Sequence, residues 1–254
     1  MFIIPARLAS TRFKHKILAD INGKPMFVQT ALGAAKVGQV AVACDESSVL
    51  EVAKSHGLQA VLTSRDHESG TDRICEAAEK LGLADDEIII NIQADEPFFE
   101  QENLRLFADF AARSLKQGAF MASCYKQTSH EEALNPNLVK VVLASNSNLT
   151  NLADGEAAQE ALYFSRSLIP YPRSECETYF AHIGIYAYSV ANLREFCALQ
   201  TRFLENTEKL EQLRALAAGK KIAMMRLETQ SIGIDTLEDL KTAQIKFGFS
   251  SNLL

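Results

Sequence analysis

The sequence predicts an α/β fold in three layers, in which helices cover both faces of a mostly parallel sheet. Short runs rich in valine and isoleucine alternate with longer amphipathic stretches. The short runs are apolar on both faces, as is typical of strands inside a parallel sheet. From about Glu131 polar loops separate the strands, so we expect a smaller inserted α/β subdomain at approximately 131–220. The whole chain of 254 residues, 1–254, is expected to be one domain that contains it.

The first half of the chain supplies the expected sheet and its helices. Short strands rich in Val and Ile are expected at 1–4, 39–44, 58–62 and 87–92, and a further strand is expected at 120–126. Helices with apolar residues three and four apart are expected at 25–36, 46–56, 72–81 and 102–116. Pro25 suits a first helical turn, while Gly57 and Gly82 stand where helix ends favour a left-handed residue.

The second half alternates less regularly. Strands are expected at 138–143, 161–164, 179–188 and 221–228, and helices at 190–199, 206–218 and 236–247. Polar, turn-rich residues predict exposed loops at 145–155 and 171–176.

Charge and composition exclude several classes of protein. The chain has 26 Lys and Arg against 32 Asp and Glu, and this acidic balance disfavours a nucleic-acid binder. Five scattered cysteines without a C-x-x-C pair predict reduced, mostly buried thiols, not a disulfide framework or a zinc site. The apolar start stops at Pro5, and the apolar runs are far shorter than the ~20 residues that span a bilayer. We therefore expect a cytoplasmic protein without membrane insertion.

The loop after the first strand concentrates positive charge. Arg7, Arg12, Lys14 and Lys16 share it with two hydroxyl residues, and the first 24 residues hold five basic side chains against one acidic. Ligands on parallel sheets bind beyond the carboxyl ends of the strands. Arginine recognises phosphate bidentately and lysine supplies a mobile charge, so this loop is suited to a polyphosphate. The alternative is a solvated surface loop with incidental charges.

Two acidic turns are suited to a metal ion. Asp95 and Glu96 follow an apolar strand, where one or two carboxylates and substrate phosphates suffice to hold Mg²⁺. The alternative is that Asp95 caps a helix. In the second turn, Asp235 or Thr236 is expected to cap the last helix, and a carboxylate has lone pairs enough for a cap and a metal.

Other signals are weaker. His182 lies in an alternating strand and is more typical of a hydrogen-bonded structural residue than of a base. Arg166 follows a strand end and could meet a substrate carboxylate or solvent. The tract 208–214 has ordinary helical charge spacing. In the loop 67–73, Arg73 and the hydroxyls could read a base edge or cap a helix.

In this order, the tracts resemble the CMP-Kdo synthetases, or 3-deoxy-manno-octulosonate cytidylyltransferases, from Ile3 to about Lys246. The tracts are Ile-Pro-Ala-Arg at 4–7 with Ser-Thr-Arg at 10–12, and those at 23–26, 69–73, 93–97, 135–142, 162–170, 182–186, 208–214 and 233–236. The resemblance implies a Rossmann-like nucleotidyltransferase sheet. It implies that CTP and Kdo react to CMP-Kdo and diphosphate with Mg²⁺, in lipopolysaccharide biosynthesis. It also implies a homodimer built through the middle subdomain.

The resemblance also implies roles for individual residues. Those expected to bind CTP are Pro5, Ala6, Arg7, Ser10, Arg12, Lys16, Ser69, Gly70, Thr71, Arg73 and Gln93. Asp95 and Asp235 would hold the metal, and Arg12, Lys16 and Asp95 would be catalytic. Those expected to contact the sugar acid are Arg166, His182, Glu211 and Gln212, with Arg166 facing its carboxylate.

The chain departs from the family at three places. Lys14 and His15 replace the usual Pro-Gly, and Ile17 replaces a proline after Lys16. Ala94 replaces the glycine of Gln-Gly-Asp-Glu-Pro. We expect Ala94 to be tolerated provided that this position does not need a positive φ.

Other readings remain open at this point. The sugar could be an 8-amino Kdo analogue or sialic acid, although CMP-sialic acid synthetases have a Gly-Gly-Ser-Lys type loop where this chain has residues 8–12. A non-catalytic nucleotide-binding protein would be expected to lack the metal carboxylates or phosphate arginines. A glycosyltransferase would consume a nucleotide sugar instead of making one.

Overall fold

The chain forms two compact units, and the computed structural model describes residues 1–10, 13–144, 159–201 and 203–251. The first unit comprises Met1–Arg105 and Thr229–Leu254, and the second comprises Leu106–Glu228. The predicted subdomain at 131–220 falls within the second unit, and its boundaries stay a prediction. No helix in the described part of the chain is long and apolar enough to cross a membrane.

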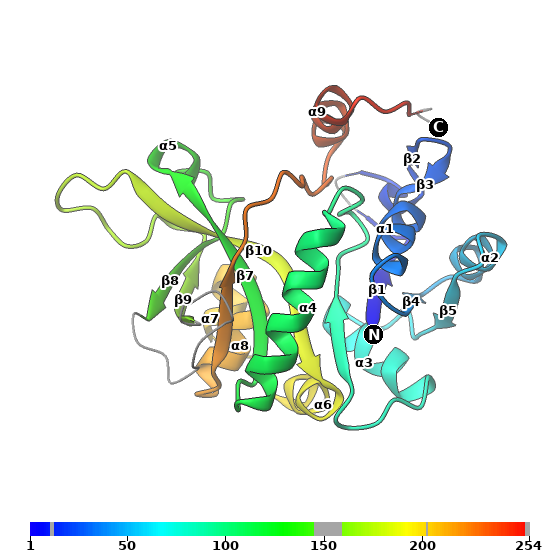
Figure 1. The fold of residues 1–254 in the computed structure, drawn as a ribbon, viewed down its shortest axis with the longest axis horizontal. Helices are drawn as coiled ribbons and strands as arrows, with labels where there is room; N and C mark the ends of the chain where they lie inside the picture. The colour runs from blue at the N-terminus through cyan, green and yellow to red at the C-terminus, as the bar shows by residue number, and fades with distance from the viewer. Residues whose placement is uncertain (11–12, 145–158, 202, 252–254) are drawn as a thin grey trace. The chain divides into compact units, whose positions relative to one another are not determined.

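The first unit contains parallel strands with helices packed on them (Figure 1). Its strands run in the order β5-β4-β1-β6, namely Gln59–Leu62, Val40–Cys44, Phe2–Ala6 and Ile88–Asn91, and each neighbouring pair is parallel. Every residue of β1 and β4 is buried, as in strands covered on both faces. The helices against this sheet are α1 (Met26–Ala35), α2 (Ser47–Ser55) and α3 (Gly70–Lys80). Parallel order brings the carboxyl ends of the strands to one edge, where the predicted site segments begin.

Short elements follow β1 before the first long helix. A 3-10 turn, η1 (Lys16–Leu18), leads to a hairpin of β2 (Asp20–Ile21) and β3 (Lys24–Pro25). This hairpin was not predicted, although its turn is Asn22-Gly23, with φ angles of 53° and 78°. Asn-Gly favours such two-residue hairpin turns because both positions require positive φ.

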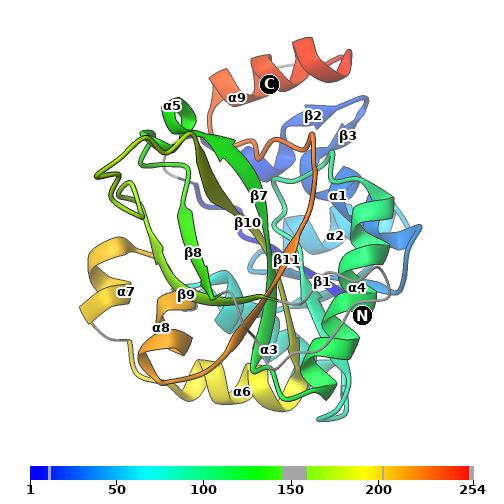
Figure 2. The same ribbon diagram turned by 60° about the vertical axis from the view of Figure 1, so that its left-hand side comes forward.

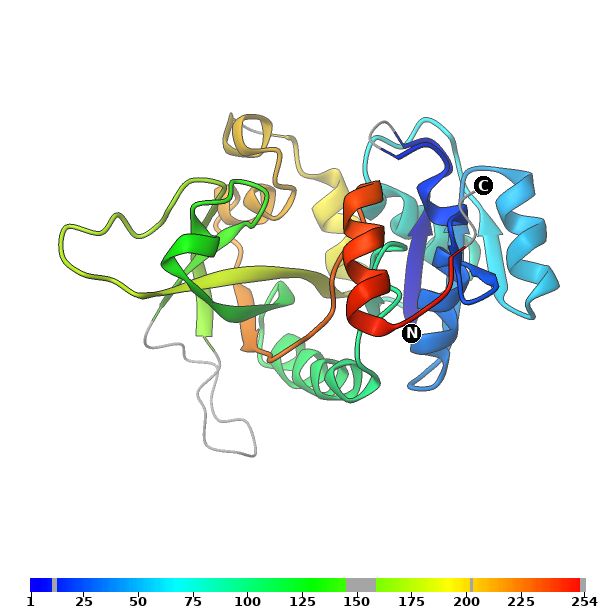
Figure 3. The ribbon, with the colours of Figure 1, turned by 90° about the horizontal axis from the view of Figure 1, so that it is seen from above.

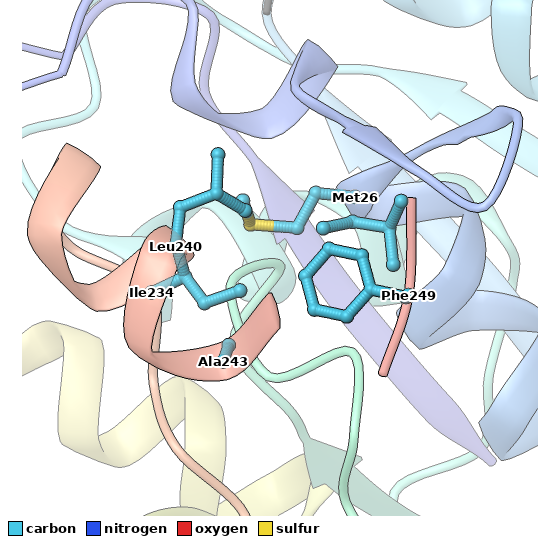
Figure 4. Packing of buried hydrophobic residues seen from close by; sticks show 6 residues of the cluster. Met26, Ile234, Leu240, Ala243 and Phe249 are labelled. Atoms are coloured by element: carbon cyan, nitrogen blue, oxygen red, sulfur yellow. The ribbon is translucent and has the colours of Figure 1, made fainter. Parts of the chain in front are cut away.

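Helix α9 (Leu237–Phe247) packs on these short elements. Figure 3 shows it in red beside the blue N-terminal part of the chain. Leu240 and Ala243 of α9 lie with Ile234 and Phe249 around Met26 in a buried apolar cluster (Figure 4). The cluster holds the end of the chain against the segment that follows η1.

The strands of the second unit pair side by side, and the last strand in the order also pairs with the first (Figure 2). The order is β10-β7-β11-β9-β8, namely Thr178–Ser189, Met121–Ser129, Ile222–Arg226, Gln159–Ser165 and Lys140–Ala144. An additional pairing of Ala181 with Lys140 joins β10 to β8. Only β7 and β11 pair in parallel among these strands, so the described strands make a mixed arrangement over the whole chain. Helix α4 (Gln101–Lys116) spans the boundary of the units. The remaining helices of this unit are α5 (His130–Ala133), α6 (Val190–Ala198), α7 (Phe203–Glu208) and α8 (Gln212–Ala217).

The single helix predicted at 206–218 is wrong, because α7 and α8 replace it. The helix is interrupted at Lys209, whose φ of 53° is incompatible with a right-handed helix. The break leaves backbone carbonyl groups without helical partners, and these are used by Arg166, as described below.

Two smaller predictions have different outcomes. The five cysteines are thiols that form no disulfide with one another, as expected, and three are buried, namely Cys44, Cys75 and Cys124. The loop predicted at 145–155 lies outside the described residues.

Candidate functional site

The loop after β1 carries the first group of predicted residues. Pro5 and Ala6 are buried at the end of the strand, and Arg7 is exposed and donates from Nε to the carbonyl of Ala9 at 3.1 Å. Ser10 is partly exposed. The predicted catalytic residue Arg12 lies outside the described residues.

His15 in this loop adopts a left-handed conformation, with φ 54° and ψ 31°. It stands where the resembling family has glycine, so this chain keeps a left-handed turn with a side chain that tolerates it moderately well. Ala94 is not among the described residues with positive φ. The condition set for Ala94 is therefore met.

Lys16 lies between the two predicted metal aspartates. Its Nζ donates to Asp95 Oδ2 at 2.5 Å and to Asp235 Oδ1 at 2.7 Å. Burial lowers the pKa of Lys16, but the charges and hydrogen bonds of the two carboxylates outweigh burial and leave the pKa raised. Two acids from distant parts of the sequence thus converge on one cation.

Neither aspartate is the cap of a helix. Asp95 lies in a turn after β6, and α4 begins only at Gln101, so the cap alternative for Asp95 is wrong. Thr236 caps α9 in a capping box with Asp239. Asp235 precedes this cap, which leaves its carboxylate available to Lys16.

The donor set here suits Mg²⁺ when phosphate completes it. Carboxylate oxygens are hard ligands of the kind that Mg²⁺ prefers, and Asp95 and Asp235 already converge on a positive charge. No group of three or more His, Cys, Asp or Glu within the described residues is arranged to hold a metal. The two aspartates would therefore need substrate oxygens and water to fill the coordination shell.

The segment before α3 meets the end of β1. Ser69 caps α3 by accepting from the Asp72 backbone N–H. A Cβ on Gly70 would lie 3.3 Å from Pro5 and 3.9 Å from Oε1 of Gln93, so glycine permits this close approach. Thr71 is buried in the first turn. The structure thus brings together Pro5, Gly70 and Gln93, three of the residues predicted to bind CTP.

Arg73 is bound by other residues. Its buried guanidinium donates from Nη1 to Thr63 Oγ1 at 2.7 Å, and Nη2 lies 3.6 Å from Oδ2 of Asp45. The other oxygen of Asp45 accepts the Leu8 backbone N–H at 3.1 Å. Asp45 was not among the predicted residues, although an acid directly after β4 lies at the same sheet edge as the basic loop.

Arg166 lies in the second unit, at the end of β9, and is held by main-chain carbonyls. Its guanidinium donates to Glu208 O at 2.7 Å, Pro136 O at 3.2 Å and Lys209 O at 3.4 Å. The Glu208 carboxylate accepts the Arg166 backbone N–H at 2.9 Å. Buried Lys140 donates to the Arg166 carbonyl at 2.6 Å. The position of Arg166 is thus fixed from several sides.

His182 faces the interior of the second unit. Its Nε2 lies 2.9 Å from Ser123 Oγ, and burial lowers the pKa of His182 to about 3. The imidazole is therefore neutral at physiological pH. The ring lies beside Tyr186, whose hydroxyl donates to Gln212 Oε1 at 3.3 Å. Burial and, secondarily, the charge of Glu211 raise the pKa of Tyr186.

The side-chain amide of Gln212 has a donor nitrogen that the described part of the chain does not use. Its Nε2 is buried and has no hydrogen-bond partner among the described residues. A buried amide without a partner is costly, so a ligand oxygen at this position would be favourable. His182, Glu211 and Gln212 therefore group around Tyr186, and Arg166 is held separately by α7 and its following turn.

Comparison with known proteins gives a consistent result. The family model for cytidylyltransferases matches residues 1–222. The 3-deoxy-manno-octulosonate cytidylyltransferase of Nitratiruptor sp. is 50% identical over 97% of this chain and 99% of its own. That of Wolinella succinogenes is 49% identical over 98% of this chain and 100% of its own. A solved structure described as CMP:2-keto-3-deoxy-manno-octonic acid synthetase complexed with CTP is 34% identical, with a TM-score of 0.86 and 97% of each chain covered.

Proposed function

The chain belongs to the cytidylyltransferase family, and we propose that it transfers CMP from CTP to the 2-hydroxyl of Kdo and releases diphosphate. Relatives that are 50% and 49% identical in sequence over nearly the full length are named for this activity. The structural observation that carries the proposal is the convergence of Asp95 and Asp235 on Lys16, at the sheet edge where the basic loop begins. Cations and paired carboxylates at one edge are suited to a nucleoside triphosphate and its metal.

The reaction needs positioning and charge neutralisation more than a strong base. The 2-hydroxyl oxygen attacks the α-phosphorus and loses its proton to water, and the bond from this phosphorus to the diphosphate oxygen breaks in line. Lys16, Arg7 and Arg12 would neutralise the diphosphate as it departs. Asp95 and Asp235 would hold Mg²⁺, which when bound lowers the pKa of the hydroxyl and withdraws charge from phosphate oxygens. Ser10 and Thr71 would add hydroxyl contacts to CTP.

The sugar would bind to residues of the second unit. Arg166 would pair with the sugar carboxylate, and its fixed position reduces the entropy lost on binding. Gln212 would donate its free amide hydrogens to a sugar hydroxyl, and neutral His182 would offer a hydrogen bond without a charge. Glu211 would accept from another hydroxyl. We also propose that the enzyme is a cytoplasmic homodimer with an inserted sugar-binding subdomain, on the strength of the family resemblance.

The test is to follow diphosphate release with CTP, Mg²⁺ and one sugar at a time. Kdo, its 8-amino analogue and sialic acid are offered to the wild-type enzyme. We expect the highest kcat/KM with Kdo. Highest kcat/KM with another of the three acids would correct the substrate, and no release with any of them would contradict the transferase itself.

A further inference from the structure

We propose that Glu100 and Glu96 are positioning residues that set the separation of Asp95 and Asp235, and so determine the affinity of the site for its metal. This inference rests on the proposed function. Asp95 follows β6, whereas Asp235 precedes α9, so no single element holds both. Mg²⁺ accepts ligands only at short distances in a near-octahedral shell. A contact that ties the two acidic turns together therefore controls whether both carboxylates can bind one ion.

Glu100 makes the first tie, to residues that follow the second unit in sequence. Its carboxylate accepts from Thr229 Oγ1 at 2.6 Å and from the Gln230 backbone N–H at 2.7 Å. Asn103 donates to the same carboxylate at 3.0 Å. Burial raises the pKa of Glu100, but these donors outweigh it and leave the pKa lowered. The ionised Glu100 carboxylate thus binds the start of residues 229–234, which we call the connecting segment.

Glu96 makes the second tie, closer to the metal ligands. Its Oε2 accepts from Ser231 Oγ at 2.7 Å. A Cβ on Gly233 would lie 3.0 Å from Oε1 of Glu96, so a side chain at this position would press on the carboxylate and displace it. The backbone N–H of Ile234 then donates to the carbonyl of Asp95 itself at 3.0 Å. The connecting segment is bound along its length to the turn that carries Asp95.

The far side of Asp235 is held as well. The Asp239 carboxylate accepts the backbone N–H of Asp235 at 3.0 Å and that of Thr236 at 2.8 Å. Asp235 is therefore fixed between the connecting segment and the first turn of α9. Removing a hydrogen bond between the connecting segment and Glu96 or Glu100 leaves the bonds of Asp239 to Asp235 and Thr236 intact. We therefore expect the fold to persist while the distance between the Asp95 and Asp235 carboxylates becomes more variable.

The experiment measures Mn²⁺ binding by electron paramagnetic resonance in the presence of CTP and without sugar. Thr229→Val removes the side-chain tie to Glu100, and Ser231→Ala removes the tie to Glu96, both without a change of charge. Glu100→Gln tests the anchor itself. Its matched control is Glu102→Gln, because Glu102 lies two residues further on, in the first turn of α4, is exposed and pairs only loosely with Arg105 at 3.5 Å.

We expect Glu100→Gln and the double variant Thr229→Val/Ser231→Ala to bind Mn²⁺ about ten-fold more weakly than wild type. Glu102→Gln should bind it normally. Excess Mg²⁺ should restore kcat in the weakened variants, which a general loss of structure would not allow. Wild-type Mn²⁺ affinity in Glu100→Gln, or in the double variant where Glu100→Gln does not fold, would overturn the proposal. So would a wild-type protein that binds no Mn²⁺. Mn²⁺ affinities in the expected order without diphosphate release would instead overturn the proposed reaction and support the positioning roles.

Discussion

Lys16 neutralises both acids of the proposed metal site, at 2.5 Å from Asp95 and 2.7 Å from Asp235. In the proposed reaction, a cation in this place would stabilise the leaving diphosphate when CTP is bound. The same cation would compete with a divalent ion for the carboxylates when CTP is absent. Lys16 is therefore expected to influence catalysis and metal binding in opposite directions.

Lys16→Met should lower kcat by about 10²- to 10³-fold, since removal of one donor at a developing charge has this effect. In the absence of CTP the same variant should bind Mn²⁺ more tightly than wild type. Steady-state kinetics and Mn²⁺ titration measure the two effects. Lys36→Met, at an exposed position after α1, is the control. Unchanged turnover in Lys16→Met would remove the residue from the catalytic group.

His182 should make stability depend on pH. Its pKa in the folded chain is about 3, below the ordinary value of 6.5. Between these two pH values the imidazole is therefore protonated in the unfolded chain but not in the folded chain. The free energy of unfolding therefore falls as the pH drops from 6.5 toward 3, by up to about 2 kcal/mol at pH 5 from this residue. Urea unfolding of wild type and His182→Gln at pH 7 and pH 5 measures the difference. Equal losses in both proteins would show that His182 does not contribute.

His15 should reveal the cost of its left-handed backbone. At φ 54° a β-branched residue is strongly disfavoured and glycine is not. We expect His15→Val to be less stable than His15→Gly by about 1–2 kcal/mol in urea unfolding. Equal stability of the two variants would mean that the loop adopts another conformation in solution.

At the level of elements, α9 begins directly after Asp235 of the proposed metal site and packs on residues near the start of the chain. Leu240 is 1% exposed within the cluster of Figure 4, whereas Ile245 on the same helix is 87% exposed. Leu240→Ala should lower the free energy of unfolding by about 2–4 kcal/mol, and Ile245→Ala by less than about 0.5 kcal/mol. Because Asp235 directly precedes α9, Leu240→Ala should also raise the Mg²⁺ concentration needed for half-maximal rate. Similar effects of the two substitutions would contradict the packing described.

Most elements could be predicted because their apolar patterns are local. The four strands of the first unit and helices α1 to α4 lie within a few residues of their predicted ranges. The break at Lys209 could not be predicted, since the apolar spacing continues across it and the carbonyls it frees are used by Arg166, far away in sequence. Tertiary contacts of this kind override local propensity.

The site was predictable to a similar extent. Clustered charge after β1 and acids after β6 indicated a phosphate and metal site from the sequence alone, and the structure brings Lys16, Asp95 and Asp235 together. The supporting residues were not predictable. Asp45 and Glu100 act through contacts with Leu8 and Thr229, and no sequence spacing encodes such distant pairs.

At the scale of the whole molecule, the chain divides its proposed tasks between two units. Residues of the triphosphate and metal site lie in the first unit, and residues proposed for the sugar acid lie in the second. The connecting segment 229–234 returns the chain to the first unit immediately before Asp235. The acidic chain thus has its basic loop and the carboxylates proposed to hold the metal in one unit, where the proposed triphosphate would need both.

The central claim is that CMP is transferred from CTP to Kdo, and ³¹P nuclear magnetic resonance of the reaction mixture tests it most directly. With CTP, Kdo and Mg²⁺, the wild-type enzyme should give a new phosphodiester resonance. Its integral should correspond to one molecule of phosphodiester product for each diphosphate released. Asp235→Asn, which removes one charge from the proposed metal site, should produce both far more slowly. Diphosphate release without a phosphodiester product, or no reaction of CTP at all, would contradict the claim.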